Sequence, residues 1–179
     1  MTNKLYLDWN QIEKHCYSLS IEILKSGFMP DYIVGITRGG LTPAVMLSHM
    51  LNVPMHALHV SLRDGGDSES NCWMSEDAFG YVPDEKRGLI KSRWDSQFQK
   101  KILVVDDIND SGDTIAWIKN DWQSTCLPNE DSWNKVWGNN VRFATLVNNL
   151  ASKQSIDYTS LEINKAENDV WIVFPWERS

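Results

Sequence analysis

Hydrophobic and polar positions form two kinds of pattern along this chain of 179 residues. Apolar residues that begin with Trp9 recur every three or four positions over residues 9–23, which predicts a helix capped by Asp8 and ended by Gly27. Short apolar runs rich in β-branched residues follow, and such runs are typical of strands covered on both faces. The predicted strands are residues 31–36, 55–61, 101–105 and 141–147, with helices at 43–51 and 114–122.

This alternation of strands and helices predicts an α/β fold. Crossovers between parallel strands are nearly always right-handed, so we expect a mostly parallel, twisted sheet with helices on both faces. The length suits one domain with a substantial core, and residues 1–179 are therefore expected to form a single domain. Periodicity lapses over residues 62–99, where a polar loop and several aromatic residues predict either a flexible lid or a surface insertion that packs on a neighbouring subunit.

The most informative motif is residues 102–114, ILVVDDINDSGDT. Its apolar run stops at Asp106 and Asp107, and a small hydroxyl-rich turn at residues 111–114 precedes the predicted helix. Ligands of open α/β sheets bind at the carboxyl ends of the strands. Carboxylates bind a diol or a hard cation such as Mg²⁺, and the start of a helix favours a phosphate. The segment therefore predicts a site for a phosphorylated ribose.

Two other protein classes carry an acidic pair after a strand. A Walker B strand requires a G-x-x-x-x-G-K-[ST] loop, which this chain lacks. A receiver domain has its acidic pair near the amino terminus, whereas about a hundred residues precede Asp106 here. The pair alone remains a weak signal, and Ser111 could serve only as a helix cap.

A second motif, TRGGLTP at residues 37–43, follows the predicted strand 31–36. Gly39 and Gly40 allow unusual backbone angles, so that successive N–H groups can converge on an anion. Arg38 adds a forked donor with a permanent charge. Thr42 is the expected helix cap, with Pro43 at the first helical position. The alternative interpretation is an ordinary glycine-rich turn with a solvated arginine.

Together, the two motifs resemble those of type I phosphoribosyltransferases. In that family, a hydrophobic run leads into two acidic residues, two variable positions and Asp-[Ser/Thr]-Gly-x-Thr, and residues 102–114 match throughout. The resemblance implies Mg²⁺-dependent transfer of the 5-phosphoribosyl group from phosphoribosyl pyrophosphate (PRPP) to a nucleobase, with release of pyrophosphate. It also favours a lid made from residues 62–99 over the reaction centre.

The resemblance also assigns a role to each motif residue. Asp110 would be the catalytic residue, as general base or hydrogen-bond acceptor for the imidazole ring of a purine. Asp106 and Asp107 would hold the metal. The chain departs from the family at Asp113, where members often have lysine or glycine. The ribose and 5′-phosphate would be bound by Asp106, Asp107, Asp110, Ser111, Gly112, Asp113 and Thr114, and pyrophosphate by Thr37, Arg38 and Gly39, with a cis peptide at Thr37–Arg38.

Residues 169–177 contain a predicted short strand and resemble the base-binding end of bacterial xanthine-guanine phosphoribosyltransferases. That resemblance implies that Trp171 stacks on a purine and that the Ile172 backbone reads the edge of the purine. Alternatively, both tryptophans of this segment, Trp171 and Trp176, could be core or subunit contacts. Family members selective for 6-oxopurines place a lysine after the strand equivalent to residues 145–147. This chain has Asn148 and Asn149 there. Asn148 is the expected base-binding residue, since an amide both donates and accepts.

The asparagines leave the identity of the base open. Hypoxanthine, guanine and xanthine are the expected substrates, but an asparagine does not dictate an oxygen at carbon 6. Lys153 and Lys165 are alternative partners for the base, although neither occupies the matching position.

Bulk composition restricts the possible partners. A net charge of −7 gives no sign of the basic face that nucleic-acid binding normally needs. The resemblance implies PRPP and a nucleobase as the partners. Three widely spaced cysteines fit neither a disulfide framework nor a zinc site, and no apolar segment reaches the length of a signal peptide core or a membrane span. We therefore expect a cytoplasmic enzyme. A homodimer or homotetramer is implied by the resemblance alone.

Two other functional classes remain open. The chain could be a regulatory module that binds PRPP without catalysis, as some family members do. It could also be an interaction protein whose tryptophan-rich insertion forms a subunit interface, with vestigial loops.

Overall fold

The computed structural model describes residues 3–62, 68–90, 92–126 and 131–177. Its main sheet has five strands in the order β3-β2-β4-β5-β6, and every neighbouring pair is parallel. These strands are β2 (Tyr32–Thr37), β3 (Met55–His59), β4 (Ile102–Asn109), β5 (Val141–Asn149) and β6 (Tyr158–Ile163). The longer helices are α1 (Trp9–Lys25), α2 (Leu41–Leu51), α3 (Cys72–Phe79) and α5 (Asp113–Cys126).

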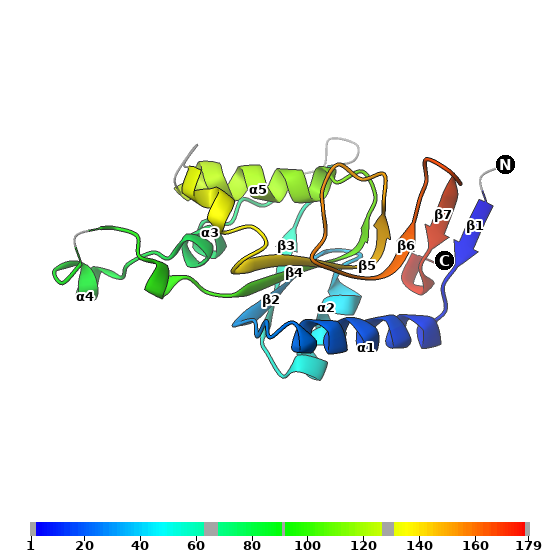
Figure 1. Ribbon diagram of the computed structural model, residues 1–179, viewed down its shortest axis with the longest axis horizontal. Helices are drawn as coiled ribbons and strands as arrows, with labels where there is room; N and C mark the ends of the chain where they lie inside the picture. The colour runs from blue at the N-terminus through cyan, green and yellow to red at the C-terminus, as the bar shows by residue number, and fades with distance from the viewer. Residues whose placement is uncertain (1–2, 63–67, 91, 127–130, 178–179) are drawn as a thin grey trace.

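Helices cover both faces of the main sheet, as Figure 1 shows, with α1 and α2 on one side and α3 and α5 on the other. Successive strand side chains point to opposite faces. Ile33 and Leu103 therefore join the core cluster under α1 and α2, whereas Val34 and Val104 join the cluster under α5. The predicted fold class, a mostly parallel α/β sheet with helices on both faces, is confirmed.

The boundaries of some elements differ from the sequence-based predictions. Helix α1 has the predicted Asp8 cap, strengthened by a reciprocal hydrogen bond with Gln11, but Trp9 is 56% exposed rather than part of the core. Helix α2 begins at Leu41 with Gly40 as its N-cap, so Thr42 is not the cap. Pro43 lies in the third helical position, where its missing N–H costs nothing because the first helical N–H groups have no partner within the helix.

The interpretation of residues 62–99 as irregular chain is wrong for the part that contains α3. This helix buries Met74 and Ala78 against the sheet, and the Ser75 hydroxyl donates to the Trp122 carbonyl on α5. A short helix α4 (Asp84–Arg87) and a 3₁₀ helix (Ser96–Phe98) follow. Residues 63–67 and 91 of the predicted lid lie outside the described residues, so the lid stays a prediction.

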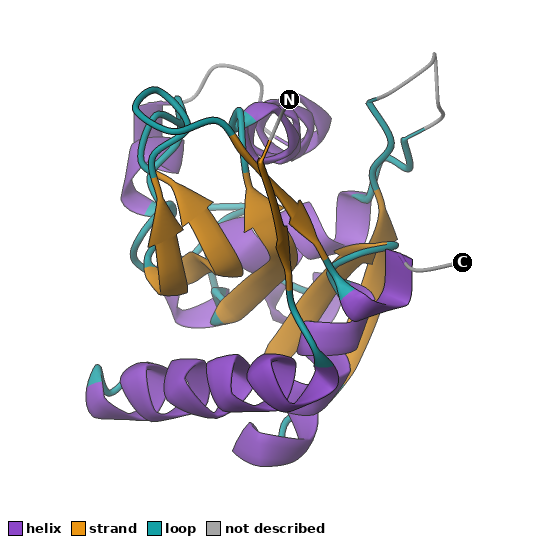
Figure 2. Ribbon diagram, turned by 90° about the vertical axis from the view of Figure 1, so that its right-hand side faces the viewer, coloured by secondary structure: helices purple, strands orange, loops and turns teal. Residues whose placement is uncertain are grey.

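A second, two-stranded sheet joins the two ends of the described chain. Strand β1 (Asn3–Tyr6) pairs in parallel with β7 (Val170–Val173), which places Trp171 opposite Lys4. Figure 2 looks onto this end of the molecule, where both marked termini lie. The sequence analysis predicted β7 but not its partner. This pairing holds the predicted base-binding strand in place.

Most tryptophans are buried in the hydrophobic core or pack against it. Trp122 and Trp133 are fully buried, and Trp137 stacks on Trp133 with 5.4 Å between ring centroids. These contacts reduce the number of tryptophans available to a subunit interface, and the oligomeric state stays a prediction. No helix in the described part of the chain is long and apolar enough to cross a membrane.

Replacing Trp122 with alanine tests the core beneath α5. The substitution should lower the free energy of unfolding by about 3–5 kcal/mol, because it leaves a large cavity between α5 and the sheet. Tyr17→Ala is the matched control, since Tyr17 is 61% exposed and should change stability by less than about 0.5 kcal/mol. Denaturant unfolding measures both, and equal effects would refute the assigned packing.

Candidate active site at the carboxyl edge of the sheet

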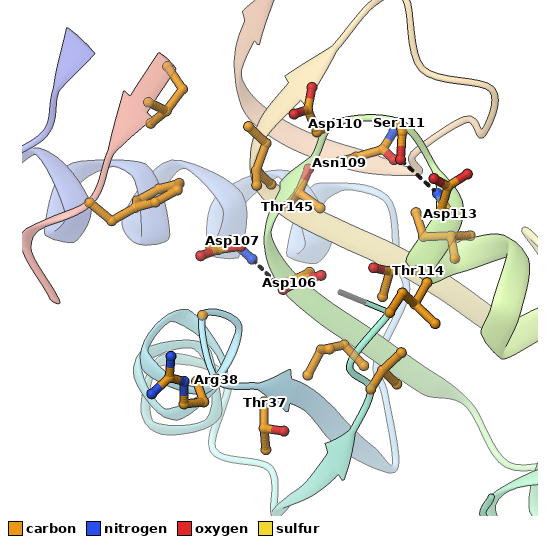
Figure 3. Close-up of a pocket in the computed structure, with 18 of the residues that line it drawn as sticks. Thr37, Arg38, Asp106, Asp107, Asn109, Asp110, Ser111, Asp113, Thr114 and Thr145 are labelled. Carbon is orange, nitrogen blue, oxygen red and sulfur yellow. Dashed lines mark hydrogen bonds between the residues drawn. The ribbon is translucent and has the colours of Figure 1, made fainter. Parts of the chain in front are cut away.

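A cavity of about 920 Å³ opens at the carboxyl ends of β2 and β4 and reaches β7. Figure 3 shows Thr37 and Arg38 on one side, Asp110 and Ser111 on the other, and Asp106 and Asp107 between them. The structure thus brings three sequence motifs that lie far apart in the chain to one cavity. The predicted site residues that line it are Thr37, Arg38, Gly39, Asp106, Asp107, Asp110, Ser111, Gly112, Asp113, Thr114, Trp171 and Ile172.

The acidic pair lies on β4 itself, because the strand continues to Asn109 rather than ending at Val105. Asp106 pairs in register with Thr145 of β5, and the Asp107 backbone N–H donates to Asp106 Oδ1 at 2.9 Å. Burial raises the pKa of Asp106 well above its usual range, and the charge of Asp107 raises it further. Burial also raises the pKa of Asp107 to about 6, with a second contribution from Glu177. The pair therefore binds protons, or another cation, more readily than exposed carboxylates do.

The donor set fits a hard cation that is only partly held by protein. Within the described residues, neither carboxylate of the pair forms an ion pair with lysine or arginine. The same residues contain no cluster of three acidic, histidine or cysteine side chains arranged for a metal. Magnesium commonly binds through one or two carboxylates and takes its other ligands from substrate oxygens and water. Asp106 and Asp107 have the chemistry for such a site.

Gly39 is required where the β2–α2 loop meets the acidic pair. A Cβ atom on Gly39 would lie 1.9 Å from Asp107 Oδ2, and one on Gly40 would lie 2.4 Å from the Val105 carbonyl oxygen. The Thr37–Arg38 peptide is cis, as the resemblance implied. Thr37 Oγ1 is 2.7 Å from His59 Nδ1 on β3, and Arg38 is exposed at the cavity. The loop therefore presents backbone and guanidinium donors directly beside two carboxylates.

The turn between β4 and α5 is held by the chain that connects β5 and β6. Gly112 has φ +90°, and a Cβ atom there would lie 2.8 Å from Ser152 Oγ. The Lys153 N–H donates to the Ser111 carbonyl at 3.1 Å, and Ser152 Oγ donates to Asn109 Oδ1 at 3.0 Å. Helix α5 then begins at Asp113, with its first N–H groups directed toward the cavity end of the turn. This geometry is suited to a phosphate.

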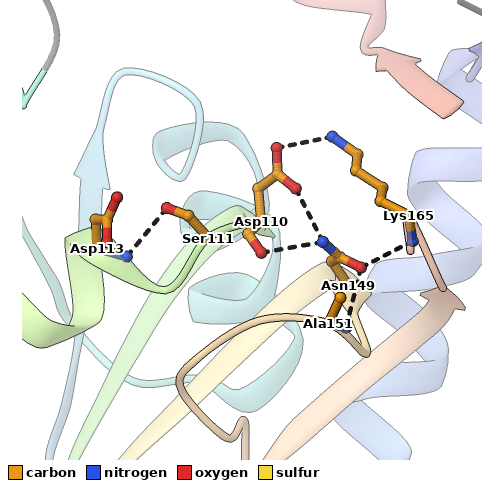
Figure 4. A network of polar contacts seen from close by, with 6 residues as sticks. All are labelled: Asp110, Ser111, Asp113, Asn149, Ala151 and Lys165. Carbon is orange, nitrogen blue, oxygen red and sulfur yellow. Dashed lines mark hydrogen bonds and ion pairs between the residues drawn. The ribbon is translucent and has the colours of Figure 1, made fainter. Parts of the chain in front are cut away.

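The third part of the cavity combines Asp110 with aromatic residues of the carboxyl-terminal segment. Trp171 is 46% exposed on the rim, whereas Ile172 is 5% exposed and packs in the core. Figure 4 shows that Asp110 contacts both Asn149 and Lys165. Lys165 Nζ is 2.7 Å from Asp110 Oδ2 and 5.7 Å from the centroid of the Trp171 ring. This part of the cavity offers a flat aromatic face beside a charged hydrogen-bonding edge.

One predicted site residue is not in the cavity. Asn148 does not line it, and its carboxamide oxygen accepts a hydrogen bond from Asn109 Nδ2 at 2.8 Å. Three further residues line the cavity although neither motif indicates a role for them: His59, Thr145 and Glu177. They are single residues on separate elements, so no local motif could have indicated them.

Comparisons with known proteins agree with this geometry. A family model described as the phosphoribosyl transferase domain matches residues 2–178. A hypoxanthine-guanine phosphoribosyltransferase of Schizosaccharomyces pombe is 28% identical over 97% of this chain and 89% of its own. A xanthine-guanine phosphoribosyltransferase of Cereibacter sphaeroides is 25% identical over 96% and 86%. The solved purine phosphoribosyltransferase of Pyrococcus horikoshii shares the fold with a TM-score of 0.64, at 24% identity over 98% of this chain and 95% of that one.

The buried acidic pair should make the ligand-free protein less stable as pH rises. The pKa of Asp107 is about 6 in the fold against 3.8 for the ordinary group, so the folded state binds the proton more tightly and loses that advantage between these values. Asp107→Asn removes this loss. We compare the free energy of unfolding of this variant with that of wild type in the presence of a chelator. The difference, variant minus wild type, should increase by on the order of 1–3 kcal/mol from pH 4.5 to pH 7.5.

Denaturant unfolding at the two pH values measures the difference. Asp169→Asn serves as the control because Asp169 is exposed, and its relative stability should stay nearly constant. A similar pH response in both variants would mean that Asp107 does not carry a raised pKa.

Proposed function

The chain belongs to the phosphoribosyl transferase family, and from that premise we propose that it transfers the 5-phosphoribosyl group of PRPP to a purine in a Mg²⁺-dependent reaction. The match over residues 2–178 also confirms the resemblance drawn from its two loops. The preferred base would be hypoxanthine, guanine or xanthine. The observation that carries this proposal is the single cavity in which both loops and the β7 tryptophan meet.

Each part of the cavity matches one part of PRPP. The turn at residues 111–114 would bind the 5′-phosphate through helix N–H groups and hydroxyls. Asp106 and Asp107 would bind the ribose diol. Arg38 and the N–H groups around Gly39 would bind pyrophosphate, with the guanidinium matching its oxygens. The spacing of the three subsites along one sheet edge supports a single extended ligand.

The reaction would displace pyrophosphate from carbon 1 of the ribose. A bond forms between a purine nitrogen and carbon 1, and the bond from carbon 1 to the pyrophosphate oxygen breaks. Asp110 would accept the proton, or a hydrogen bond, from the imidazole ring as the purine loses its N–H proton. Trp171 would hold the base plane by stacking. Most of the rate would come from alignment of the two substrates and from donors around the leaving group.

The metal would be held by Asp106 and Asp107 together with substrate oxygens. When bound, Mg²⁺ neutralises negative charge on the phosphates and on the departing pyrophosphate. The raised pKa values of both carboxylates support this assignment, because a cation would offset the burial that disfavours their charged forms and the repulsion that Asp107 exerts on Asp106.

An assay of pyrophosphate release tests the proposal. The full chain, with PRPP and Mg²⁺, should release pyrophosphate with hypoxanthine, guanine or xanthine. Saturable PRPP binding without release on any base would instead indicate a regulatory module, and absence of PRPP binding would refute the proposed site.

Asp110→Asn tests the assigned proton role. The variant should lose about 10²- to 10⁴-fold in kcat/KM for the base and keep its affinity for PRPP, because the amide cannot take the proton. Asp131→Asn removes the same charge at an exposed position that does not line the cavity and should retain turnover. Full activity of the Asp110 variant would show that another group accepts the proton.

Gly39→Ala tests the contact between the β2–α2 loop and the acidic pair. Its Cβ atom would displace the Asp107 carboxylate, so PRPP affinity measured by calorimetry should fall at least about tenfold, or roughly 1.4 kcal/mol. Gly88→Ala is the control, because a Cβ atom there meets no other atom within 4 Å. Unchanged affinity in the Gly39 variant would exclude the loop from binding PRPP.

A further inference from the structure

Lys165 lies where the base would bind, although it does not come from the strand that the family pattern would use. It follows β6 in the segment that leads to β7, its side chain is 17% exposed, and it lines the cavity. We propose that Lys165 reads the substituent at carbon 6 of the purine and selects bases that carry an oxygen there. This inference rests on the proposed function and on Asp110 facing the imidazole nitrogen.

The arrangement of atoms on a purine connects these two residues. The imidazole nitrogen N7 and the substituent at carbon 6 lie side by side on one edge of the ring system. A group that lies against the partner of N7 therefore faces the carbon 6 substituent. Lys165 Nζ is 2.7 Å from Asp110 Oδ2 and lies over the Trp171 ring at 5.7 Å from its centroid. A base stacked on Trp171 with N7 toward Asp110 would direct its carbon 6 substituent toward this ammonium group.

The chemistry of an ammonium group supplies the selectivity. It has three N–H donors and no acceptor. It can keep its contact with Asp110 and still donate to a carbonyl oxygen of hypoxanthine, guanine or xanthine. The amino group of adenine is a donor at the same place. Adenine would therefore leave a partly buried cation facing another donor, which is strongly unfavourable.

Asn149 occupies the region where the family pattern has its lysine, but its carboxamide is fully used within the protein. Its Nδ2 donates to Asp110 Oδ1 and to the Asp110 carbonyl oxygen, both at 3.2 Å. Its Oδ1 accepts from the backbone N–H groups of Ala151 and Lys165, both at 3.1 Å (Figure 4). With two donors and two acceptor positions filled and 6% exposure, Asn149 has no group left to read a base.

Asn149 instead positions its neighbours. Its hydrogen bonds fix the Asp110 carboxylate and the Lys165 backbone relative to each other. The asparagine on β5 and the lysine after β6 thus form one unit in which the first positions the second. Lys153, the other lysine of this region, is exposed and is not among the described residues that line the cavity.

Kinetics on four bases test the proposal. Wild type, Lys165→Met, Lys165→Arg and Lys153→Met are assayed at saturating PRPP and Mg²⁺ with hypoxanthine, guanine, xanthine and adenine. Lys165→Met should lower kcat/KM for the three 6-oxopurines by about 10- to 100-fold, the usual effect of losing a hydrogen bond from a charged donor. Its KM for PRPP should stay within about twofold, and its kcat/KM for adenine should not fall, because the unfavourable contact between the ammonium group and the amino group is removed. Lys165→Arg should keep most of the preference, and Lys153→Met should match wild type.

Product binding gives a readout that does not depend on turnover. Calorimetry compares inosine 5′-monophosphate with adenosine 5′-monophosphate on the same proteins. Wild type should prefer the inosine nucleotide, and Lys165→Met should lose most of that preference while binding the adenosine nucleotide at least as tightly as wild type does.

The outcomes separate the two proposals. If wild type releases no pyrophosphate with any base, the proposed function fails and this inference fails with it. A second outcome is that wild type turns over a purine while Lys165→Met leaves the ratio of kcat/KM for hypoxanthine to kcat/KM for adenine unchanged, or lowers kcat/KM for all bases equally. In either case only the role of Lys165 is wrong. A collapse of the ratio in Lys165→Met but not in Lys153→Met supports it.

Discussion

Two neighbouring carboxylates, partly buried at the carboxyl edge of a parallel sheet, are the feature on which the rest of this site depends. Burial raises the pKa of both Asp106 and Asp107, the charge of Asp107 raises that of Asp106 further, and the charge of Glu177 raises that of Asp107 further. Such a pair persists only because the surrounding fold is stable enough to hold it. The close approach of the β2–α2 loop at Gly39 then brings the Arg38 guanidinium and this loop's backbone to the same cavity. The fold thus concentrates negative charge and anion-binding groups side by side, which is the arrangement that a metal-bound polyphosphate sugar requires.

In the proposed function, segments of different origin would divide substrate recognition between them. The central strands β2 and β4 supply the ribose phosphate and pyrophosphate regions through contiguous loops. The base region is assembled from the ends of the sheet and of the chain, through β7, its partner β1 and the segment after β6. A region built from several elements can change its specificity without disturbing the two loops. The proposed role of Lys165, which follows β6 rather than β5, would be an example.

Sequence reasoning succeeded where the information was local. Runs such as residues 102–105 are apolar because both faces of a central strand are covered, so the main strands and their loops were predictable. Helix α3 and strand β6 were missed because each is short and mixes polar with apolar residues. Strand β1 is exposed along its whole length, and only its pairing with β7 makes it a strand. The network of Asp110, Asn149 and Lys165 depends on three separate segments, and spacing along the chain carries no signal for it.

The most direct test of the acidic pair as the centre of a metal-dependent PRPP site is proton release on binding. Calorimetric titration of PRPP with Mg²⁺ near pH 6, in buffers of different ionisation enthalpy, counts the protons released after correction for the ionisation of PRPP itself. Because the pKa of Asp107 is about 6 and a cation needs the ionised carboxylate, binding should release protons at pH 6, and Asp107→Asn should release fewer. Binding that releases no protons at pH 6, or that proceeds equally well without Mg²⁺, would contradict the account.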